Sequence, residues 1–342
     1  MQQLTFIKPG QLEWWDVLEP KLEGPKQAIV RPVAVATCDL DAAIIQGRVP
    51  FRGPFAFGHE FVAEVVEVGE EVKGIRPGQR VIVPFQISCG ECRYCLRGQT
   101  GDCANVKELS SYGLGNLGGK WGGALSELVR VPFAEAMLVA LPPGINPASV
   151  ASASDNLPDA WRTVGPYLEQ QPESPVLIAG GGMSGSIGLY AVGIAKALGA
   201  SQIDYLDNDL GRLELAKSLG ANPLEFKDTP PIRLGRYPIT VDASANPASL
   251  AAVLRSTEPG GVCTSIGIYY GRETPLPLLE MYTSGLTFKT GRAMARPAIP
   301  KILELVQSGQ LQPQQVTSEQ ANWGDAAEAL LHYRTKLIIS RD

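Results

Sequence analysis

Four of the chain's six cysteines lie in one short segment, CGECRYCLRGQTGDC, at the spacing C-x2-C-x2-C-x7-C. Four thiolates in a tight loop match the tetrahedral ligand set of a closed structural zinc site. We expect Gly90, Gly98 and Gly101 to supply the unusual backbone angles that such a loop requires. The predicted ligands are Cys89, Cys92, Cys95 and Cys103. Because four protein ligands leave no open position on the ion, this zinc would be structural.

Two disulfides or separate buried thiols are the alternatives for these cysteines. Disulfides suit small secreted chains, whereas Met1 here leads directly into the strand-like pattern QLTFIKPG without a secretory segment. The 342 residues are enough for two domains, and 44% of them are apolar. A net charge of −5 without a basic cluster argues against a nucleic-acid partner.

The longest uncharged run, Ser174 to Ala195, must be considered as a membrane span because of its length. Its glycines interrupt it, and its pattern is that of a strand, a turn and a helix. We therefore predict that the chain does not enter a membrane. A cytoplasmic location follows as the expectation, and it agrees with reduced cysteines.

The first 150 residues are rich in β-branched runs that are bounded by Gly and Pro turns. This pattern predicts an antiparallel barrel or sandwich. The expected strands are Ala28–Ala36, Phe61–Gly69, Arg80–Phe85 and Leu125–Pro132.

Strands alternate with helical stretches after a predicted helix from Pro158 to about Glu169. This alternation predicts an α/β fold with a doubly wound parallel sheet of six strands. The expected strands are Val176–Ala179, Ile203–Leu206, Leu224–Phe226, Ile239–Asp242, Val262–Ile268 and Leu286–Lys289. The expected helices lie in 210–220, in 246–257 and near Leu278.

The pattern changes again after about Arg292. Helices are expected at Ile299–Ser308 and Asp325–Tyr333, followed by a closing strand at Lys336–Ser340. We expect this tail to return to the first domain. The predicted division is therefore residues 1–156 with 293–342, and a second domain of residues 157–292.

A glycine-rich turn joins a predicted strand to a helix in the segment PVLIAGGGMSGSIG, residues 175–188. Gly180, Gly182 and Gly185 match G-x-G-x-x-G in the strand–turn–helix context of a dinucleotide site. The helix is expected only from Gly188, so Gly188 could instead be the glycine that packs against the strand, and the turn would be longer than usual. The predicted cofactor-binding residues of this turn are Gly180, Gly182, Met183, Ser184, Gly185, Ser186, Ile187 and Gly188.

Asp207 ends the next predicted strand, at the distance from the glycines where a ribose-binding acid is expected. A carboxylate accepts the ribose hydroxyls and repels a 2′-phosphate, which favours NAD over NADP. Arg212 favours the opposite interpretation, since an arginine nearby can bind that phosphate. A plain turn aspartate is the alternative role for Asp207.

A second, open metal site is indicated by other residues. Cys38 lies in ATCDLD, and His59, one of only two histidines, lies in FGHE beside Glu60. A catalytic zinc takes about three protein ligands and keeps one position open. Cys38 and His59 are therefore the first two candidate ligands.

The cysteine loop, the GHE segment and the glycine-rich turn, in this order, resemble the zinc-dependent medium-chain alcohol dehydrogenase family. The resemblance covers nearly the whole chain. It implies a GroES-like catalytic domain interrupted by a Rossmann domain. It also implies a homodimer or homotetramer, assembled through an edge strand near Val262–Ile268.

The resemblance also implies a third ligand about six residues before an aromatic residue. Asp155 lies six residues before Trp161, and Asp159 is the second choice. The family further implies a place near the metal for Glu60, as an alternative ligand or a neighbour. Asp41 matches an aspartate that orients the zinc-binding histidine, which fixes the tautomer of the imidazole.

The chain departs from the family in the residues that carry the alcohol proton outward. A Ser or Thr and often a His are usual at the positions of Leu40 and Ala43, and neither residue here can relay a proton. The proton would leave through water, with Asp39, Glu60 or Thr37 as acceptor. The same gap could also indicate an aldehyde-handling or dismutase-like use of a retained NAD.

Two further residues carry weaker expectations. Phe85 matches a position that lines the substrate channel, although an aromatic residue there is more often simply packed in the core. Lys336 could reach the pyrophosphate, but a solvated lysine is the simpler expectation.

We therefore predict a zinc- and NAD(H)-dependent oxidoreductase that interconverts an alcohol or polyol and its aldehyde or ketone. A zinc-free quinone or enone reductase of the same fold is one alternative, against which the two metal-ligand patterns argue. A catalytically retired NAD-binding protein is the other, and it rests on the missing proton relay.

Overall fold

Strand β3 (Ala28–Ala36) lies inside the main sheet of the first half of the chain. It pairs antiparallel with β5 (Glu60–Val68) along its length, and the register shifts between Pro32 and Ala34. Proline has no N–H to donate to a neighbouring strand, so an interior proline is compatible with a strand where the regular pairing is interrupted. Both strands lie within one residue of their predicted ranges.

The main sheet has the order β15–β16–β3–β5–β6–β8, and β7 also pairs with β3. Its remaining strands are β6 (Arg80–Val83), β7 (Val129–Val131), β8 (Val139–Ala140), β15 (Glu319–Asn322) and β16 (Leu337–Ser340). Of the strand predicted at Leu125–Pro132, only the three residues of β7 form one. A smaller antiparallel sheet, β2–β1–β4, consists of β1 (Gln2–Lys8), β2 (Gln11–Asp16) and β4 (Phe55–Ala56).

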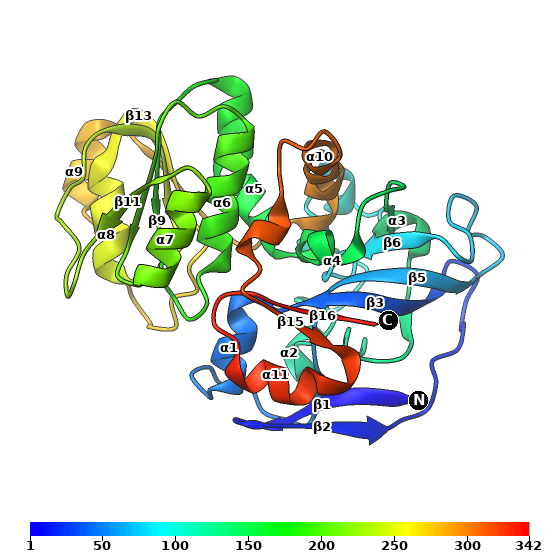
Figure 1. The fold of residues 1–342 in the computed structure, drawn as a ribbon. Coiled ribbons are helices and arrows are strands. Elements are labelled where there is room, and N and C mark those ends of the chain that lie inside the picture. Colours follow the sequence, from blue (N-terminus) through cyan, green and yellow to red (C-terminus); the bar gives the residue numbers. More distant parts are fainter. Residues whose placement is uncertain (342) are drawn as a thin grey trace. The chain divides into compact units, whose positions relative to one another are not determined.

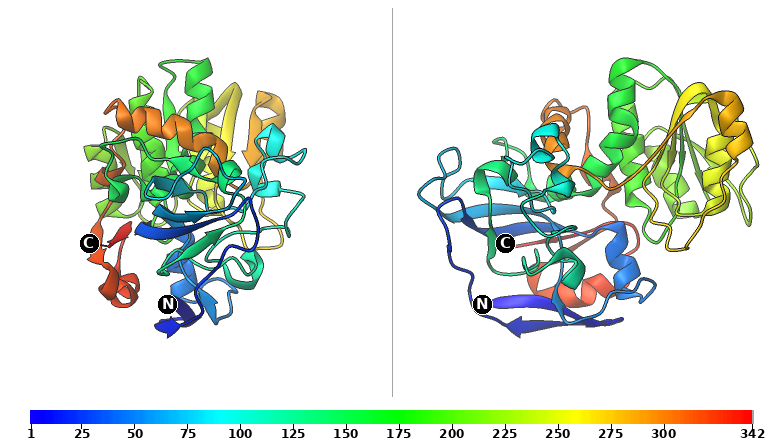
Figure 2. Two further views of the ribbon diagram at one scale, coloured as in Figure 1. Left: turned by 90° about the vertical axis from the view of Figure 1, so that its right-hand side faces the viewer. Right: turned by 180° about the vertical axis from the view of Figure 1, so that it is seen from behind.

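The C-terminal tail adds its last strand to the main sheet, as the sequence predicts. β16 pairs antiparallel with β3, and Figure 2 shows the red C-terminal segment running beside the blue β3. The helices of this half are α1 (Asp39–Ile45), α2 (Gly115–Gly118), α3 (Ala134–Met137), α4 (Pro147–Val150), α10 (Ala295–Gln307) and α11 (Ala326–His332). α10 begins four residues earlier than the prediction from Ile299.

The middle of the chain forms a parallel sheet of six strands, as predicted, in the order β11–β10–β9–β12–β13–β14. The strands are β9 (Val176–Ala179), β10 (Ile203–Asp207), β11 (Asn222–Glu225), β12 (Tyr237–Asp242), β13 (Thr257–Ser265) and β14 (Thr287–Thr290). All four residues of β9 are buried, as expected for a central strand that is covered on both faces. β13 is an interior strand, so the edge strand expected near Val262–Ile268 is instead β14.

Helices cover this sheet in two groups (Figure 1). α6 (Ser186–Ala197) and α7 (Leu210–Ser218) contact β9, β10 and β11, whereas α8 (Pro247–Ser256) and α9 (Leu278–Ser284) contact strands of the β12–β13 side. The strand order reverses between β9 and β12, and right-handed crossovers on either side of this point place the two groups on opposite faces. Ligands of such sheets bind at the carboxyl ends of the strands at the reversal point.

The structure, a computed structural model, describes residues 1–341, and their contacts divide the chain into two units. Unit 1 comprises Met1–Pro158, Ala293–Gly309 and the segment from Thr317 onward; unit 2 comprises Asp159–Arg292 and Gln310–Val316. The sequence predicts that the whole tail returns to the first domain, whereas residues 310–316 pack with unit 2. The helix that joins the two, α5 (Asn156–Gln170), begins two residues before its predicted start. Within residues 1–341, no helix has both the length and the apolar character needed to cross a bilayer.

Candidate metal centres and nucleotide turn

The four cysteines predicted as ligands lie together in unit 1. Their Sγ atoms all lie within 4.8 Å of one another, and the cysteines are free thiols. Backbone N–H groups point at the sulfur atoms, from Cys89 to Cys103 Sγ at 3.4 Å and from Ala104 to Cys92 Sγ at 3.4 Å. The backbone N–H groups of Cys95 and Ala104 lower the pKa of Cys92 to about 6, and thiolates are the form that binds zinc.

Two glycines of this loop are required for different reasons. Gly90 has φ +78°, and a Cβ on it would lie 2.6 Å from the Cβ of Ala136. Gly101 does not adopt a positive φ, but a Cβ on it would lie 2.4 Å from Nε2 of Gln86. The expectation that Gly101 supplies an unusual backbone angle is therefore wrong; it supplies space.

A second group of metal-ligating side chains lies elsewhere in unit 1. Cys38 precedes α1, His59 and Glu60 lie at the start of β5, and Asp155 follows the 3-10 helix Ala151–Ser154. One ligand atom from each of these four residues lies within 4.8 Å of the others, and all four side chains are buried. The structure thus brings together Cys38, His59 and Asp155 from positions separated by up to 117 residues in the sequence.

The first turn of α1 explains the place of Asp41. Cys38 is the N-cap residue of this helix, and its backbone N–H donates to Asp41 Oδ2 at 2.8 Å. Asp41 Oδ1 then faces His59 Nδ1 at 3.6 Å, and both residues are only 1% exposed. A carboxylate beside Nδ1 favours a proton on that nitrogen and leaves Nε2, 3.4 Å from Asp155 Oδ2, to bind a metal.

Ser154 fixes the segment that carries Asp155. Its hydroxyl accepts the N–H of Phe61 at 2.8 Å and donates to the carbonyl of Phe61 at 2.9 Å. This pair of bonds ties Ala151–Ser154 to the strand that begins with Glu60. Asp159, the second choice for the third ligand, instead pairs with Nε of Arg162 and is not part of the cluster.

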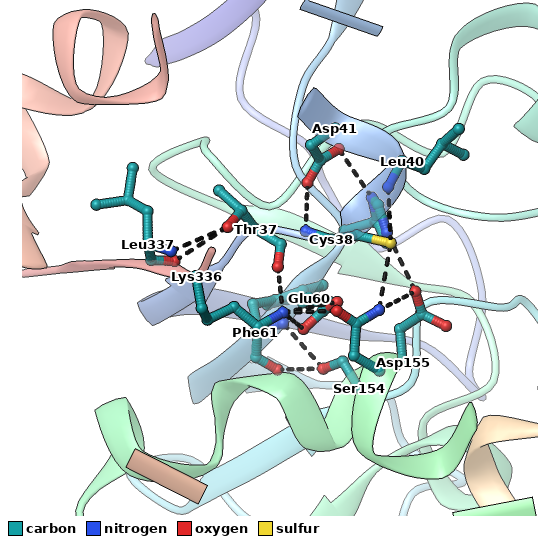
Figure 3. Close-up of polar contacts among 12 residues, drawn as sticks. Thr37, Cys38, Leu40, Asp41, Glu60, Phe61, Ser154, Asp155, Lys336 and Leu337 are labelled. Atoms are coloured by element: carbon teal, nitrogen blue, oxygen red, sulfur yellow. Dashed lines mark hydrogen bonds and ion pairs between the residues drawn. The ribbon is translucent and has the colours of Figure 1, made fainter. Parts of the chain in front are cut away.

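Lys336 is fully buried, so the expectation of a solvated lysine is wrong. Its Nζ lies 3.2 Å from Glu60 Oε2 and 2.6 Å from Asn156 Oδ1, and it also donates to the carbonyl of Thr37 (Figure 3). A buried ammonium needs a partner of opposite charge. Glu60 is the acid beside it; burial raises the pKa of Glu60 to about 8, although Lys336 acts to lower it. With these contacts, Lys336 points toward the metal-ligating cluster.

The protonation states of the cluster test whether it fits a divalent cation. Burial, together with Asp155, Glu60 and Asp41, raises the pKa of Cys38 well above its ordinary value. Burial alone would lower the pKa of His59, but Asp41, Asp155 and Glu60 outweigh it and raise that pKa to about 9. The pocket thus favours a neutral thiol and a charged imidazole. A divalent ion replaces these two protons and lets both side chains bind it, so the donor set fits zinc.

The candidate acceptors of the substrate proton differ in their hydrogen bonds and in their exposure to solvent. The Thr37 hydroxyl contacts the main chain of Leu337 at 3.1 and 3.5 Å, and Glu60 is paired with Lys336. Asp39 is partly exposed. Leu40 is partly buried beside Cys38, whose Sγ accepts its N–H at 3.5 Å. The route of the proton stays a prediction.

Phe85 packs directly on the cluster. Its ring centroid lies 5.6 Å from that of His59, with the planes tilted by 53°, and it is 9% exposed. This contact holds the imidazole from the side and gives Phe85 a packing role beside the cluster.

The glycine-rich turn follows β9 in unit 2, and α6 begins at Ser186, two residues before the predicted start. Gly188 therefore lies in the first turn of the helix, where a Cβ would meet Ala243 Cβ at 3.3 Å and Tyr205 at 3.4 Å. This is the packing expected of the glycine beside the strand. Around Gly182, by contrast, nothing lies within 4 Å of a Cβ position.

The turn contains a buried polar atom that suits a phosphate. Ser184 is 1% exposed, and its hydroxyl has no hydrogen-bond partner among the described residues. Gly185, with φ +70°, is the N-cap residue of α6, so the first backbone N–H groups of the helix follow directly. Helix N-termini of this kind bind anions. The turn therefore fits a dinucleotide pyrophosphate.

Asp207 and Arg212 bind each other. Nε and Nη2 of Arg212 donate to the two carboxylate oxygens of Asp207, each at 2.8 Å. Asp207 is fully buried and also accepts from the Tyr205 hydroxyl at 3.0 Å. Burial opposes the charge of Arg212, but Asp207 outweighs that effect and raises the pKa of the guanidinium.

Asn156 and the buried position of Lys336 are the features that sequence reasoning missed. Asn156 Nδ2 lies 3.2 Å from Cys38 Sγ and 3.3 Å from Asp155 Oδ2. The position of Asn156 directly after the candidate ligand Asp155 was a signal, but nothing in the local pattern shows where Lys336 lies.

Family models match two parts of the chain. The alcohol dehydrogenase GroES-like domain matches residues 24–143, and the zinc-binding dehydrogenase model matches residues 186–308. A probable zinc-binding alcohol dehydrogenase of Mycobacterium tuberculosis is 30% identical over 297 residues, which are 86% of this chain and 75% of that protein. The chain belongs to the zinc-dependent medium-chain dehydrogenase family. Accordingly, it is an alcohol dehydrogenase-like oxidoreductase with a GroES-like and a Rossmann part.

Other relatives agree with this family. A zinc-type alcohol dehydrogenase of Aspergillus flavus is 29% identical over 327 residues, covering 91% of this chain and 73% of that protein. The solved structure of an alcohol dehydrogenase from Thermus sp. ATN1 is similar over the whole of both chains, with a TM-score of 0.88 and 30% identity.

We expect Gly180→Ala to destabilise unit 2 because a Cβ there would lie 2.0 Å from the Tyr205 hydroxyl oxygen and 2.7 Å from Asp207 Oδ2. The loss should be about 1–3 kcal/mol of unfolding free energy, measured by urea denaturation. Tyr205→Ala removes the clashing ring, so the double variant should lose less than the two single losses added together. A Gly180→Ala protein as stable as the wild type would contradict this account of the turn.

Proposed function

We propose that the protein is a zinc- and NAD(H)-dependent oxidoreductase that interconverts an alcohol or polyol and its aldehyde or ketone. The observation that carries the proposal is the buried cluster of Cys38, His59 and Asp155. Three side chains of these types, supplemented by Glu60, are the donor set of a catalytic zinc site, which keeps one position for substrate. We further propose a structural zinc on Cys89, Cys92, Cys95 and Cys103.

When bound, zinc would lower the pKa of an alcohol and the nicotinamide would exchange the hydride. The chain's own residues hold and orient these groups. Cys38 and Asp155 supply negative charge, His59 supplies a neutral nitrogen, and Asp41 keeps the proton of His59 on Nδ1. Burial of these side chains excludes water, which strengthens their electrostatic effect.

We propose NAD rather than NADP as the nucleotide. Arg212 was the argument for NADP, but its guanidinium is bound at two positions to Asp207, and its side chain is only 10% exposed. It is therefore not free to bind a 2′-phosphate. Asp209, with a half-exposed side chain, adds a negative charge to the same segment and would repel that phosphate.

Aldehyde dismutation is the second candidate. The observation in its favour is the lack of a proton-carrying side chain at Leu40 and Ala43. Two relatives from Pseudomonas aeruginosa named glutathione-independent formaldehyde dehydrogenase are 33% identical over 244 residues, and the match covers 59% of their length. In dismutation, two aldehydes and water give one acid and one alcohol, and the nucleotide returns to its starting state.

A two- or four-subunit assembly is also proposed. Strand β14 is an edge strand, and the adjacent helix α9 has no buried residue. Leu278, Leu279 and Tyr282 on α9 are 66%, 76% and 85% exposed. Apolar side chains gathered beside an open sheet edge are typical of a surface that another copy covers.

The six cysteines of the described chain are free thiols, which suits a reducing compartment. We propose a cytoplasmic location; recovery of the native protein in an extracellular fraction would contradict it.

Metal analysis tests the open site. We expect about two zinc ions per wild-type chain and about one in Asp155→Ala, since one of three ligands to the open site is lost. Asp159→Ala is the matched control because its carboxylate pairs with Arg162, outside the cluster. Two zinc ions retained in Asp155→Ala, or no zinc in the wild type, would overturn the assignment.

Turnover assays test the reaction. With a panel of alcohols and polyols, NADH formation should exceed NADPH formation by roughly tenfold or more in kcat/KM, which corresponds to about 1.4 kcal/mol of discrimination. Equal yields of acid and alcohol from an aldehyde alone would favour dismutation. If protein that holds both metals turned over neither alcohols nor aldehydes, both proposed reactions would be contradicted. A retired NAD-binding protein would then be favoured.

Light scattering after size-exclusion chromatography tests the assembly. The wild type should elute as a dimer or tetramer, and Leu279→Arg should shift it toward monomer, because a buried unpaired charge is costly in an interface. Leu210→Arg, the same change at a leucine on α7 that is 64% exposed, is the control for the added charge alone. A monomeric wild type at micromolar concentration would contradict the proposal.

A further inference from the structure

Asn156 lies between the buried lysine and the metal-ligating side chains. It is fully buried, and three polar contacts converge on its amide. Lys336 Nζ lies 2.6 Å from its Oδ1, whereas its Nδ2 lies 3.2 Å from Cys38 Sγ and 3.3 Å from Asp155 Oδ2. Figure 3 shows Lys336, Cys38 and Asp155 in this part of unit 1.

Lys336 fixes which way the amide points. An ammonium group only donates hydrogen bonds, so it requires the oxygen of Asn156. The reversed amide would place its NH2 group against the ammonium of Lys336 and its oxygen against the carboxylate of Asp155. Both contacts would be repulsive, so the NH2 group faces Cys38 and Asp155.

Lys336 is itself held from several sides. Glu60 and the carbonyl of Thr37 contact the same Nζ, and the backbone of Leu337 bonds the Thr37 hydroxyl at 3.1 Å. The orientation of the amide is therefore set by Lys336, which directly precedes β16 and is 180 residues away from Asn156 in the sequence.

We propose that Asn156, oriented by Lys336, is a positioning residue that donates its amide N–H groups to Cys38 and Asp155 and so sets how strongly these two ligands hold the metal. The inference rests on the proposed metal site. A hydrogen bond to a ligating thiolate withdraws electron density from sulfur, and it also restricts the side chain to one position. Donors of this kind change metal affinity by about 10–100-fold when they are removed.

Two variants separate the donor from the acceptor. Asn156→Leu has a similar shape and removes both functions of the amide. Asn156→Asp keeps an oxygen for Lys336 but replaces the N–H donor with a negative oxygen beside Cys38 and Asp155. If the leucine variant does not fold, the aspartate variant, which retains the lysine contact, still tests the donor.

Asn105→Leu is the matched control. Its Nδ2 donates to Cys89 Sγ at 3.4 Å, so the same type of bond is lost at the four-cysteine loop. Its effect should be confined to that loop and leave metal binding by Cys38 unchanged.

The measurement uses the full-length protein with zinc kept in the four-cysteine loop and Co2+ in the open site. Two quantities are read: the energy of the thiolate-to-cobalt absorption band and the Co2+ dissociation constant from competition with a chelator. We expect Asn156→Leu to bind Co2+ about 10–100-fold more weakly, whereas in Asn156→Asp the added negative charge also attracts the cation, so the absorption band reports the lost donor in that variant. The band should move to lower energy, since a thiolate without its N–H donor gives up an electron more easily.

The outcomes separate this inference from the proposed function. Wild-type protein that binds no second metal would refute both. Wild-type protein that binds it, with a band and dissociation constant unchanged in the folded Asn156 variants, would refute only the role of Asn156 and show that its bonds merely hold the start of α5. A change in the open site of Asn105→Leu would also count against the inference, because the effect would then not be specific.

Discussion

The ion pair of Lys336 and Glu60 is the interaction on which the candidate active site depends. Both side chains are fully buried, and they lie beside two further acids, Asp41 and Asp155, and the thiol of Cys38. So many anionic groups in a dry pocket repel one another unless positive charge is supplied locally. The chain supplies positive charge through Lys336 and through the protonated imidazole of His59, and a bound divalent cation would take the place of the histidine's charge. The ligands can therefore lie this close together only because charge balance is built into the fold.

The need for a positive charge beside these acids explains why the tail returns to unit 1. β16 pairs with β3, and the residue before β16 is Lys336, whose side chain meets Thr37 at the end of β3. Without this strand the pocket would keep its acids and lose its ammonium. The doubly wound sheet is consequently an insertion into a unit that closes only with the last residues of the chain. This arrangement makes the site sensitive to the C-terminal segment although no ligand comes from it.

Much of this could be predicted from the sequence, and the rest could not for identifiable reasons. The parallel sheet follows from the alternation of strand and helix patterns. The cysteine loop follows from four cysteines in one short segment. Cys38 and His59 were candidates by residue type, but the third ligand, Asp155, required a family resemblance, because separation in sequence carries no geometric information. Lys336 and Asn156 were missed, since a buried lysine is rare and its partners lie 180 and 276 residues away. The start of α6 was predicted too late because glycines are poor helix formers, yet Ser186 and Ile187 continue the helix in front of Gly188.

The two candidate metal centres show how the same ligand chemistry can have different structural support. In the cysteine loop, the outermost ligands lie 14 residues apart, and backbone N–H groups of that same segment solvate the sulfur atoms. The local chain therefore carries most of what this site needs. The open site takes its residues from the ends of β3 and β16, the start of β5 and the start of α5, and its donors to sulfur include a side-chain amide that another residue must orient. Its geometry is a property of the whole of unit 1. A site that must keep one metal position open cannot be enclosed by its own ligands, so its rigidity has to come from surrounding groups such as Asn156, Ser154 and Asp41.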